Sequence, residues 1–204
     1  WNILFPDHMQ KIDKILVGTH NKGKFIEMSD LLPKKIQKIS PVELGIKSPI
    51  ENGKTFEDNS EIKAEFFCKN SNLVTLSDDS GLEVDALNGE PGIFSSRFAK
   101  DLGGFENAMI KILEKIKKIN KGSKAQFISS LTIQWPDGKK ITETGIIRGS
   151  LTDIRGKNGF GYDPIFVPEG YSKTFAEMNY EEKLKIDHRQ IAYKKLYSKV
   201  KVYF

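Results

Sequence analysis

Near the middle of the chain, two adjacent carboxylates, Asp78 and Asp79, follow a short apolar run at residues 73–76. The pattern predicts a buried strand that delivers both side chains to its carboxyl end, where open α/β sheets bind their ligands. Because side chains alternate along a strand, we expect the two carboxylates to do different jobs. One can hold a hard cation, and the other can position water or act as a second metal ligand.

A second polar segment, residues 18–24, reads Gly-Thr-His-Asn-Lys-Gly-Lys, directly after a predicted strand and at the start of a predicted helix. Backbone N–H groups at a helix N-terminus bind anions, and Lys24 adds a compact cation suited to a phosphate. The segment is not the Gly-x-x-x-x-Gly-Lys-Ser/Thr nucleotide loop, because no Ser or Thr follows Lys24. An ordinary capped strand–helix turn is the alternative interpretation.

Two further segments carry polar or aromatic side chains suited to a ligand. Glu51 lies in a loop between Pro49 and Thr55 and is either a solvated loop residue or, if the fold brings it to Asp79, a second metal ligand. Residues 156–166 are rich in glycine and aromatic residues. They form either a turn with core aromatics or a platform on which a planar base can stack.

The last such segment lies near the C-terminus. It contains Lys183, His188 and Arg189, with Asp187 directly before the last two. Arg189 offers five donors in a rigid fork. The segment is typical of a charged helix start capped by Asp187, and such a start can also contact a ligand.

The elements that must position these residues alternate between strand and helix. Strands are predicted at residues 14–18, 127–135 and 140–148, the last two joined by a Pro-Asp-Gly hairpin turn at 136–138. Helices are predicted at 23–32, from a Thr55–Asp58 capping box to about residue 69, at 105–119, and from residue 180 or 188 to 199. The apolar face of the second helix is predicted to be Phe56, Ile62, Phe66 and Phe67. This order favours one α/β domain with a mixed sheet and flanking helices.

Composition excludes several classes of protein. The 204 residues carry a formal net charge of +5, which suits an anionic ligand and is equally typical of a lysine-rich solvated surface. The single cysteine, Cys68, rules out a disulfide framework and favours a reducing, cytoplasmic compartment. The three histidines have no zinc spacing, and no apolar run is long enough to predict a membrane span. We interpret residues 1–13 as an N-terminal extension. Residues 1–8 are a cloning remnant or a native segment missing its start, and Met9 is an alternative start.

Taken in order, these segments resemble the inosine triphosphate pyrophosphatase family, also called the Ham1 family. The resemblance covers about residues 14–197. It rests on Thr19-x-Asn21-x-x-Lys24, on Ser-Asp-Asp-Ser-Gly at 77–81, on Pro-Gly-Ile-Phe-Ser-Ser-Arg at 91–97, on Phe-Gly-Tyr-Asp-Pro at 160–164, and on His188-Arg189. Any one motif is weak, but five in this order are specific. The departures are a bulky His20 in the phosphate turn and a short segment between residues 98 and 107.

The resemblance implies an elongated, two-lobed single domain over residues 14–204, with a central cleft, which normally forms a homodimer. It implies Mg²⁺-dependent hydrolysis of ITP, dITP and XTP to the monophosphate and pyrophosphate, with Mn²⁺ as a possible substitute. By resemblance, Asp79 is the catalytic carboxylate and a metal ligand, Glu51 is the second metal ligand, and Asp78 supports them. The implied substrate-binding residues are Thr19, His20, Asn21, Lys22, Gly23 and Lys24 around the phosphates, and Ser80, Phe160, Gly161, Tyr162, Asp163, Lys183, His188 and Arg189 around the rest of the nucleotide.

Base selection can be argued from hydrogen bonding. Inosine and xanthine carry a carbonyl oxygen at position 6, which can accept from Arg189 or a backbone N–H. The amino group of adenine would leave donors facing donors. Guanine shares the carbonyl and must be rejected at its 2-amino group, by a residue that the sequence does not identify.

Two other functions stay open at the level of the sequence. A Maf-type nucleotide pyrophosphatase of other base specificity has a related fold, but residues 160–163 and 188–189 fit it less well. A basic nucleic-acid-binding module is the second alternative. Because the aromatic residues are scattered and the predicted site is acidic, we expect no nucleic acid partner.

Overall fold

The computed structural model of the chain describes residues 11–204. The predicted extension, residues 1–13, therefore lies mostly outside the described residues. Within its described part, Ile12 is buried, and its N–H donates to the carbonyl of Tyr203 at 2.7 Å. No helix in residues 11–204 combines the length and the apolar character that a membrane crossing requires.

In the described part of the chain, a mixed sheet of six strands, in the order β2-β1-β3-β4-β5-β6, forms the centre of the fold. The strands β1, β2 and β3 pair in parallel, whereas β3, β4, β5 and β6 pair antiparallel. Their bounds are β1 (Lys14–Gly18), β2 (Gln37–Ile39), β3 (Thr75–Val84), β4 (Lys124–Gln134), β5 (Lys140–Leu151) and β6 (Phe166–Pro168). The predicted mixed sheet and the hairpin between β4 and β5 are confirmed.

Within residues 11–204, six α-helices flank this sheet: α1 (Lys22–Leu31), α2 (Phe56–Ser71), α3 (Ser95–Asp101), α4 (Phe105–Ile119), α5 (Tyr180–Leu184) and α6 (His188–Val200). The capping box predicted for α2 is present. The side chain of Thr55 accepts a hydrogen bond from the backbone N–H of Asp58, and the side chain of Asp58 accepts one from the backbone N–H of Thr55. Both starts considered for the last helix exist, since α5 begins at Tyr180 and α6 at His188.

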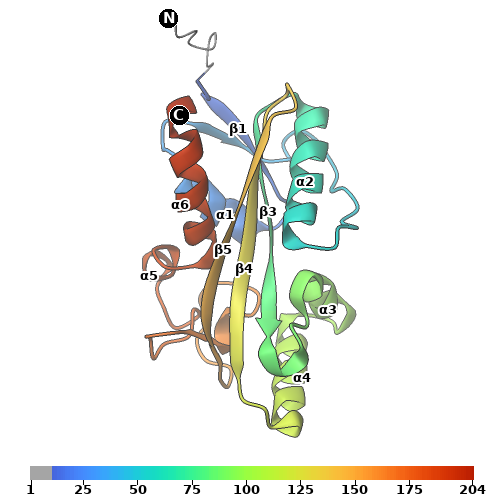
Figure 1. The fold of residues 1–204 in the computed structure, drawn as a ribbon, viewed down its shortest axis with the longest axis vertical. Helices are drawn as coiled ribbons and strands as arrows, with labels where there is room; N and C mark the ends of the chain where they lie inside the picture. Colours follow the sequence, from blue (N-terminus) through green and yellow to red (C-terminus); the bar gives the residue numbers. More distant parts are fainter. Residues whose placement is uncertain (1–10) are drawn as a thin grey trace, which may run out of the picture.

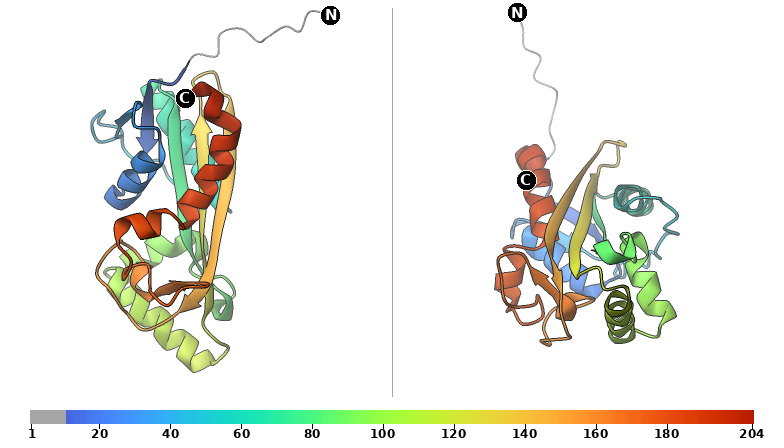
Figure 2. Two further views of the ribbon diagram at one scale, coloured as in Figure 1. Left: turned by 90° about the vertical axis from the view of Figure 1, so that its left-hand side faces the viewer. Right: turned by 60° about the horizontal axis from the view of Figure 1, so that its bottom comes forward.

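The molecule is elongated, with a lobe at each end of the long strands β3, β4 and β5 (Figure 1). Helices α1, α2 and α6 lie at one end and α3 and α4 at the other (Figures 1 and 2). Each lobe has its own hydrophobic cluster. One contains Met28 and Leu196, and the other contains Met109 and Phe166. The strands cross from one cluster to the other, so polar residues in the middle of β3 lie between the lobes.

The position of Asp78 and Asp79 within their strand differs from the prediction. We expected them at a carboxyl end, but β3 continues to Val84 and holds them in its middle. The reason is β4, which pairs with β3 along its whole length. The strand that does end here is β1, whose last residue, Gly18, pairs with Ser77. The carboxylates therefore lie just beyond the carboxyl end of β1, an edge where such sheets bind ligands.

Candidate active site

The turn between β1 and α1 is held by its own side chains. The Thr19 hydroxyl oxygen accepts from the N–H of Asn21 at 3.1 Å, and the Asn21 side-chain oxygen caps α1 by accepting from the N–H of Lys24 at 2.9 Å. His20 is exposed, and its Nδ1 lies 2.6 Å from the Ser48 hydroxyl. The capped strand–helix turn is thus present, and it leaves the other N–H groups of this helix start without side-chain partners.

Asp78 points to the face of the sheet that α1 and α6 cover. It is fully buried, and its carboxylate lies 2.8 Å from Lys24 Nζ and 3.4 Å from Arg189 Nε. The Ser129 hydroxyl donates to the same carboxylate. Burial alone would raise the pKa of Asp78, but the Lys24 and Arg189 charges outweigh it and hold this pKa well below its usual range. Asp78 is therefore a permanent anion that fixes two cations.

Asp79 points to the opposite face, toward α2, as strand alternation predicts. Its Oδ1 lies 3.3 Å from Lys63 Nζ, and the Glu51 carboxylate lies 3.2 Å from the same nitrogen. The fold thus brings Glu51 to Asp79, across a cation that the sequence analysis did not consider. Burial raises the pKa of Asp79 above its usual value, although Lys63 and Lys24 oppose the rise. A raised pKa suits a carboxylate that must take up a proton.

The carboxylates of Glu51 and Asp79 are also the candidate metal ligands. No group of three or more His, Cys, Asp and Glu side chains suited to a metal occurs within residues 11–204. Asp79 Oδ2 is buried without a hydrogen bond, and both carboxylates already converge on one positive charge, that of Lys63. A pair of carboxylates fits Mg²⁺, which is typically held by one or two carboxylates together with substrate phosphates and water.

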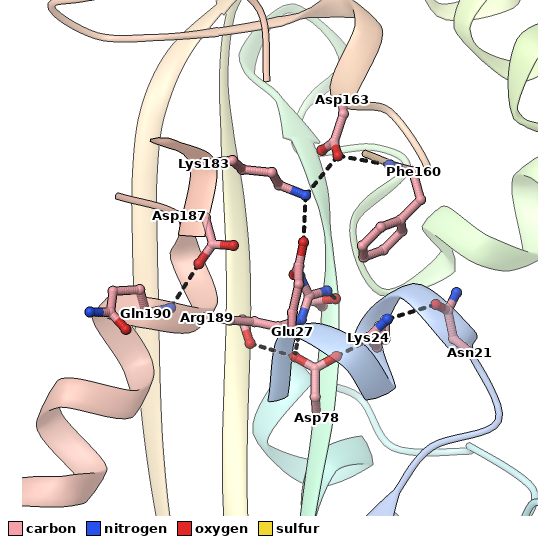
Figure 3. Close-up of polar contacts among 12 residues, drawn as sticks. Asn21, Lys24, Glu27, Asp78, Phe160, Asp163, Lys183, Asp187, Arg189 and Gln190 are labelled. Carbon is pink, nitrogen blue, oxygen red and sulfur yellow. Dashed lines mark hydrogen bonds and ion pairs between the residues drawn. The ribbon is translucent and has the colours of Figure 1, made fainter. Parts of the chain in front are cut away.

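On the other face, Glu27 of α1 joins two cations from the C-terminal part of the chain. Its carboxylate accepts from Lys183 Nζ at 2.7 Å and from Arg189 Nη1 at 2.6 Å. Lys183 also donates to Asp163 at 2.7 Å, and Arg189 Nη2 donates to the Ser80 hydroxyl at 2.8 Å. Figure 3 shows the side chains of Glu27, Lys183, Asp163 and Arg189 converging between α1 and β3. These four residues are at least nine-tenths buried.

The cations of this cluster stay charged. Burial lowers the pKa of Lys183, but Asp163 and Glu27 outweigh it and raise this pKa above the usual value. The pKa of Arg189 is raised in the same way by Asp78 and Glu27 against burial. The donors of both residues are therefore present at any physiological pH.

Aromatic side chains complete this part of the site. The Phe160 ring lies 4.6 Å from Lys183 Nζ and 5.4 Å from Arg189 Cζ. A Cβ on Gly23 would come within 2.5 Å of this ring, so only glycine lets the start of α1 approach Phe160 so closely. Tyr162 is a core aromatic, since it is 2% exposed and its hydroxyl donates to the Ser95 carbonyl at 2.7 Å.

His188 is buried and stacks on Phe127, with ring centroids 4.9 Å apart and an interplanar angle of 12°. Burial, followed by the charges of Arg189 and Lys183, lowers the pKa of His188 well below its usual value, so its imidazole is neutral. Its Nδ1 has no hydrogen-bond partner among the described residues. A neutral imidazole offers one donor and one acceptor, and here one ring nitrogen remains free for a ligand.

One pocket gathers most of the residues predicted to contact the nucleotide. Its lining consists of Asn21, Lys24, Ser80, Gly81, Ser95, Ser96, Phe105, Phe127, Phe160, Gly161, Tyr162, Asp163, Lys183, His188 and Arg189. Four predicted residues, Thr19, His20, Lys22 and Gly23, are not part of this lining. Asp79 directly precedes the lining residue Ser80. Contact of each of these residues with substrate stays a prediction.

The sequence analysis missed two charged residues of the site, Lys63 and Glu27. Each lies in a helix, and each is less than 8% exposed. Lys63 follows Phe56 by seven residues and precedes Phe67 by four, a spacing that places it on the buried face of α2. Glu27 follows Lys24 by three residues, on the same face of α1. Helical spacing was thus the signal that could have identified both.

Comparison with known proteins gives one family. Residues 15–199 match the family described as the Ham1 family. The chain is 44% identical over 200 residues to a dITP/XTP pyrophosphatase of Bartonella henselae, an alignment covering 90% of this chain and 93% of that protein. It is 42% identical over 202 residues to a dITP/XTP pyrophosphatase of Rhodopseudomonas palustris, covering 93% and 96%.

The fold has solved counterparts as well. The structure of the Staphylococcus aureus Ham1 protein superposes with a TM-score of 0.82 at 35% identity, covering 93% of this chain and 98% of that one. A Mycobacterium abscessus structure described as a nucleoside-triphosphatase and dITP/XTP pyrophosphatase superposes with a TM-score of 0.72 at 37% identity, covering 90% and 98%.

Proposed function

The chain belongs to the Ham1 family, and from this membership and the pocket between the lobes we propose that it is a nucleoside triphosphate pyrophosphatase. It hydrolyses non-canonical purine nucleoside triphosphates, namely ITP, dITP and XTP, to the monophosphate and pyrophosphate. One observation carries the proposal. Lys24 at the start of α1 and His188 and Arg189 at the start of α6 line a single pocket, together with Ser80, the residue that follows Asp79.

The phosphate end of the pocket is the start of α1. Its backbone N–H groups and the Lys24 ammonium bind the triphosphate, whose charge must be neutralised before water can approach. Glu51 and Asp79 would hold Mg²⁺, or Mn²⁺ in its place, which supplies charge neutralisation when bound. Asp79 orients the attacking water and takes up its proton, and the bond between the α- and β-phosphates breaks.

The base end of the pocket selects the substrate. Arg189 and the neutral His188 lie at the purine edge, where a 6-oxygen accepts their hydrogen bonds and a 6-amino group leaves donors unpaired. Glu27 holds Arg189 and Lys183 in place, so their donors are fixed before substrate binds. Phe160, between these cations and α1, supplies an aromatic surface at the base.

The proposal includes a homodimer, as the family resemblance implies, and a cytoplasmic location, which is supported by a single cysteine and therefore no disulfide. Sedimentation of the purified chain tests the first, and fractionation of the source cells tests the second. A monomer at all concentrations would contradict the dimer without affecting the proposed reaction.

The decisive experiment is incubation with a panel of triphosphates and Mg²⁺, followed by identification of the products. We expect ITP and XTP to yield monophosphate and pyrophosphate, with little turnover of ATP. Release of inosine diphosphate and orthophosphate would show attack at the γ-phosphate and contradict the proposal. Preference for a pyrimidine triphosphate would favour the Maf-type alternative. Salt-sensitive DNA binding without turnover would favour a nucleic-acid-binding module.

A further inference from the structure

The buried carboxyl of Asp187 stands directly before the two residues proposed to read the base. It is the N-cap of α6, because its Oδ1 accepts from the N–H of Gln190 at 2.8 Å (Figure 3). Its own N–H donates to the carbonyl of Lys183 at 3.0 Å. Asp187 therefore ties the end of α5 to the start of α6, whose first two residues are His188 and Arg189.

Asp187 differs from an ordinary helix cap in its burial. An N-cap carboxylate usually keeps its second oxygen in water, but Asp187 is 0% exposed. Its Oδ2 is buried without a hydrogen bond, and none of the ion pairs among residues 11–204 includes it. A negative charge on this side chain would therefore be unpaired.

The neighbouring charges balance without Asp187. Three cations pair with three carboxylates: Lys24 with Asp78 at 2.8 Å, Lys183 with Asp163 at 2.7 Å, and Arg189 with Glu27 at 2.6 Å. An ionised Asp187 would add a fourth carboxylate that has no cation of its own, which is unfavourable in a buried site.

The titratable and charged groups that act on Asp187 from the surrounding helices are Glu27 of α1, Lys183 and Tyr180 of α5, and Arg189 of α6. Burial, followed by repulsion from Glu27, raises the pKa of Asp187 to about 7, although Arg189 and the N–H of Gln190 oppose the rise. The direction agrees with the charge balance, since the neutral carboxyl is the form that this arrangement favours.

We propose that Asp187 is a positioning residue for the base pocket, and that it holds His188 and Arg189 in the arrangement seen here only while it carries a proton. Loss of the proton places a charge beside Glu27 and offers Arg189 and Lys183 a competing carboxylate. Their donors then leave the positions that the purine edge requires. This inference takes its substrate, ITP, from the proposed function. The protonation of the Asp187 carboxyl does not depend on that function.

The test compares wild type with Asp187→Asn and Asp187→Ala over a pH series. Asn keeps the cap and is permanently neutral, whereas Ala removes both the cap and the charge. At each pH, KM for ITP of the wild type is divided by KM of Asp187→Asn. We expect this KM ratio to rise about tenfold between about pH 6 and about pH 8.5, whereas the corresponding kcat ratio should change little. Comparison at equal pH cancels the ionisation of the substrate itself. At the acid end, Asp187→Ala should have a higher KM than Asp187→Asn.

Thermal unfolding supplies a readout that needs no activity. Because the folded pKa of Asp187 lies above its unfolded value, its contribution to stability is present at acid pH and is lost as pH rises through about 7. The Tm of wild type minus that of Asp187→Asn should therefore fall between about pH 6 and about pH 8.5.

The outcomes separate this inference from the proposed function. If wild type does not hydrolyse ITP, the proposed function fails, while the difference in Tm still reports whether Asp187 holds a proton. If ITP is hydrolysed but both the KM ratio and the difference in Tm stay constant across the pH series, Asp187 is an ordinary cap and the inference is overturned. Equal KM values for Asp187→Ala and Asp187→Asn at the acid end would overturn the positioning role.

Discussion

Asp78 and Asp79 are adjacent in sequence but face opposite sides of β3 and meet different cations. Asp78 binds Lys24 and Arg189 at the pocket between the lobes, whereas Asp79 binds Lys63 on the side of α2. The pKa of Asp78 lies below its usual range, and that of Asp79 lies above it. Asp78 is therefore held in its charged form, whereas Asp79 takes up a proton more readily than an ordinary aspartate.

Asp79→Asn should remove activity and leave the fold intact. The change keeps the shape of the side chain but removes a charge and a base, so we expect kcat for ITP to fall at least about a hundredfold. Burial already disfavours the charge at Asp79, and therefore the Tm should not fall. Steady-state kinetics and thermal unfolding of the same preparation check both parts. Near-normal turnover would overturn the catalytic assignment.

Asp78→Asn should lower the stability of the fold more than it lowers activity. Kcat should fall less than in Asp79→Asn, but the buried Arg189 and the half-buried Lys24 lose a carboxylate, and breaking a buried pair costs about 3–5 kcal/mol. Because the folded pKa of Asp78 is depressed, its stabilisation is present above about pH 4 and is lost as pH falls below that value. Urea unfolding at neutral and acid pH measures the difference. A variant as stable as wild type at neutral pH would contradict the structural role.

Removal of divalent metal should abolish hydrolysis. The candidate ligands, Glu51 and Asp79, offer only oxygen atoms, so Mg²⁺ or Mn²⁺ should restore activity after EDTA treatment better than Zn²⁺. Product release is measured after dialysis and addition of each metal in turn. Full activity in EDTA would rule out the metal role.

Lys63→Met should make the protein depend on added Mg²⁺ for stability. Without Lys63, the carboxylates of Asp79 and Glu51 repel each other with no cation between them. Mg²⁺ bound there would replace that charge and should raise the Tm of the variant more than that of wild type. Lys69→Met, on the exposed side of the same helix, is the matched control. Equal shifts in all three proteins would show that Lys63 and the metal do not share this site.

Much of the fold was predictable because it depends on local signals. The capping box fixed the start of α2, the periodic apolar residues fixed α4 at residues 105–119, and the Pro-Asp-Gly turn fixed the hairpin of β4 and β5. The length of β3 was not predictable in this way. The polar run at residues 77–81 interrupts its apolar pattern, and the strand continues through this run to the buried Leu82 and Val84 because β4 pairs with it, a contact between residues about fifty positions apart.

The sequence indicated many of the side chains that line the pocket, but fewer of those that hold one another. Lys63 and Glu27 lie within helices that otherwise pack against the sheet. The pattern of apolar residues in these helices does not indicate that a charged residue is buried among them. Phe66 and Ile62, predicted on the buried face of α2, are only half-buried, while Lys63 is buried. A buried charge is recognised only when its partner is known, and these partners come from distant segments.

Variants of Arg189 and of its partner Glu27 can distinguish two roles of Arg189, recognition of the base and support of the fold. In the structure, Arg189 is 1% exposed and already donates to Glu27 and Ser80, so a merely structural role would predict a loss of stability. A base-reading role predicts instead that the selectivity of the enzyme changes. Arg189→Ala should then lower kcat/KM for ITP while the poor rate with ATP barely moves.

The magnitude follows from the lost hydrogen bond. A bond from a charged donor is worth roughly 1.5–3 kcal/mol, so the ratio of kcat/KM for ITP over ATP should shrink about ten- to a hundredfold in Arg189→Ala. His188 lies next to Arg189 and can hold the same edge of the base. The comparison therefore includes His188→Ala and the double variant, because the effects of substitutions at neighbouring residues in one network are not additive.

Glu27→Gln is the control for support alone, since it weakens the hold on Arg189 without removing its donors. If Arg189→Ala lowers ITP and ATP turnover in equal proportion, Arg189 binds phosphate or positions α6, and base selection lies in the turn at residues 160–163.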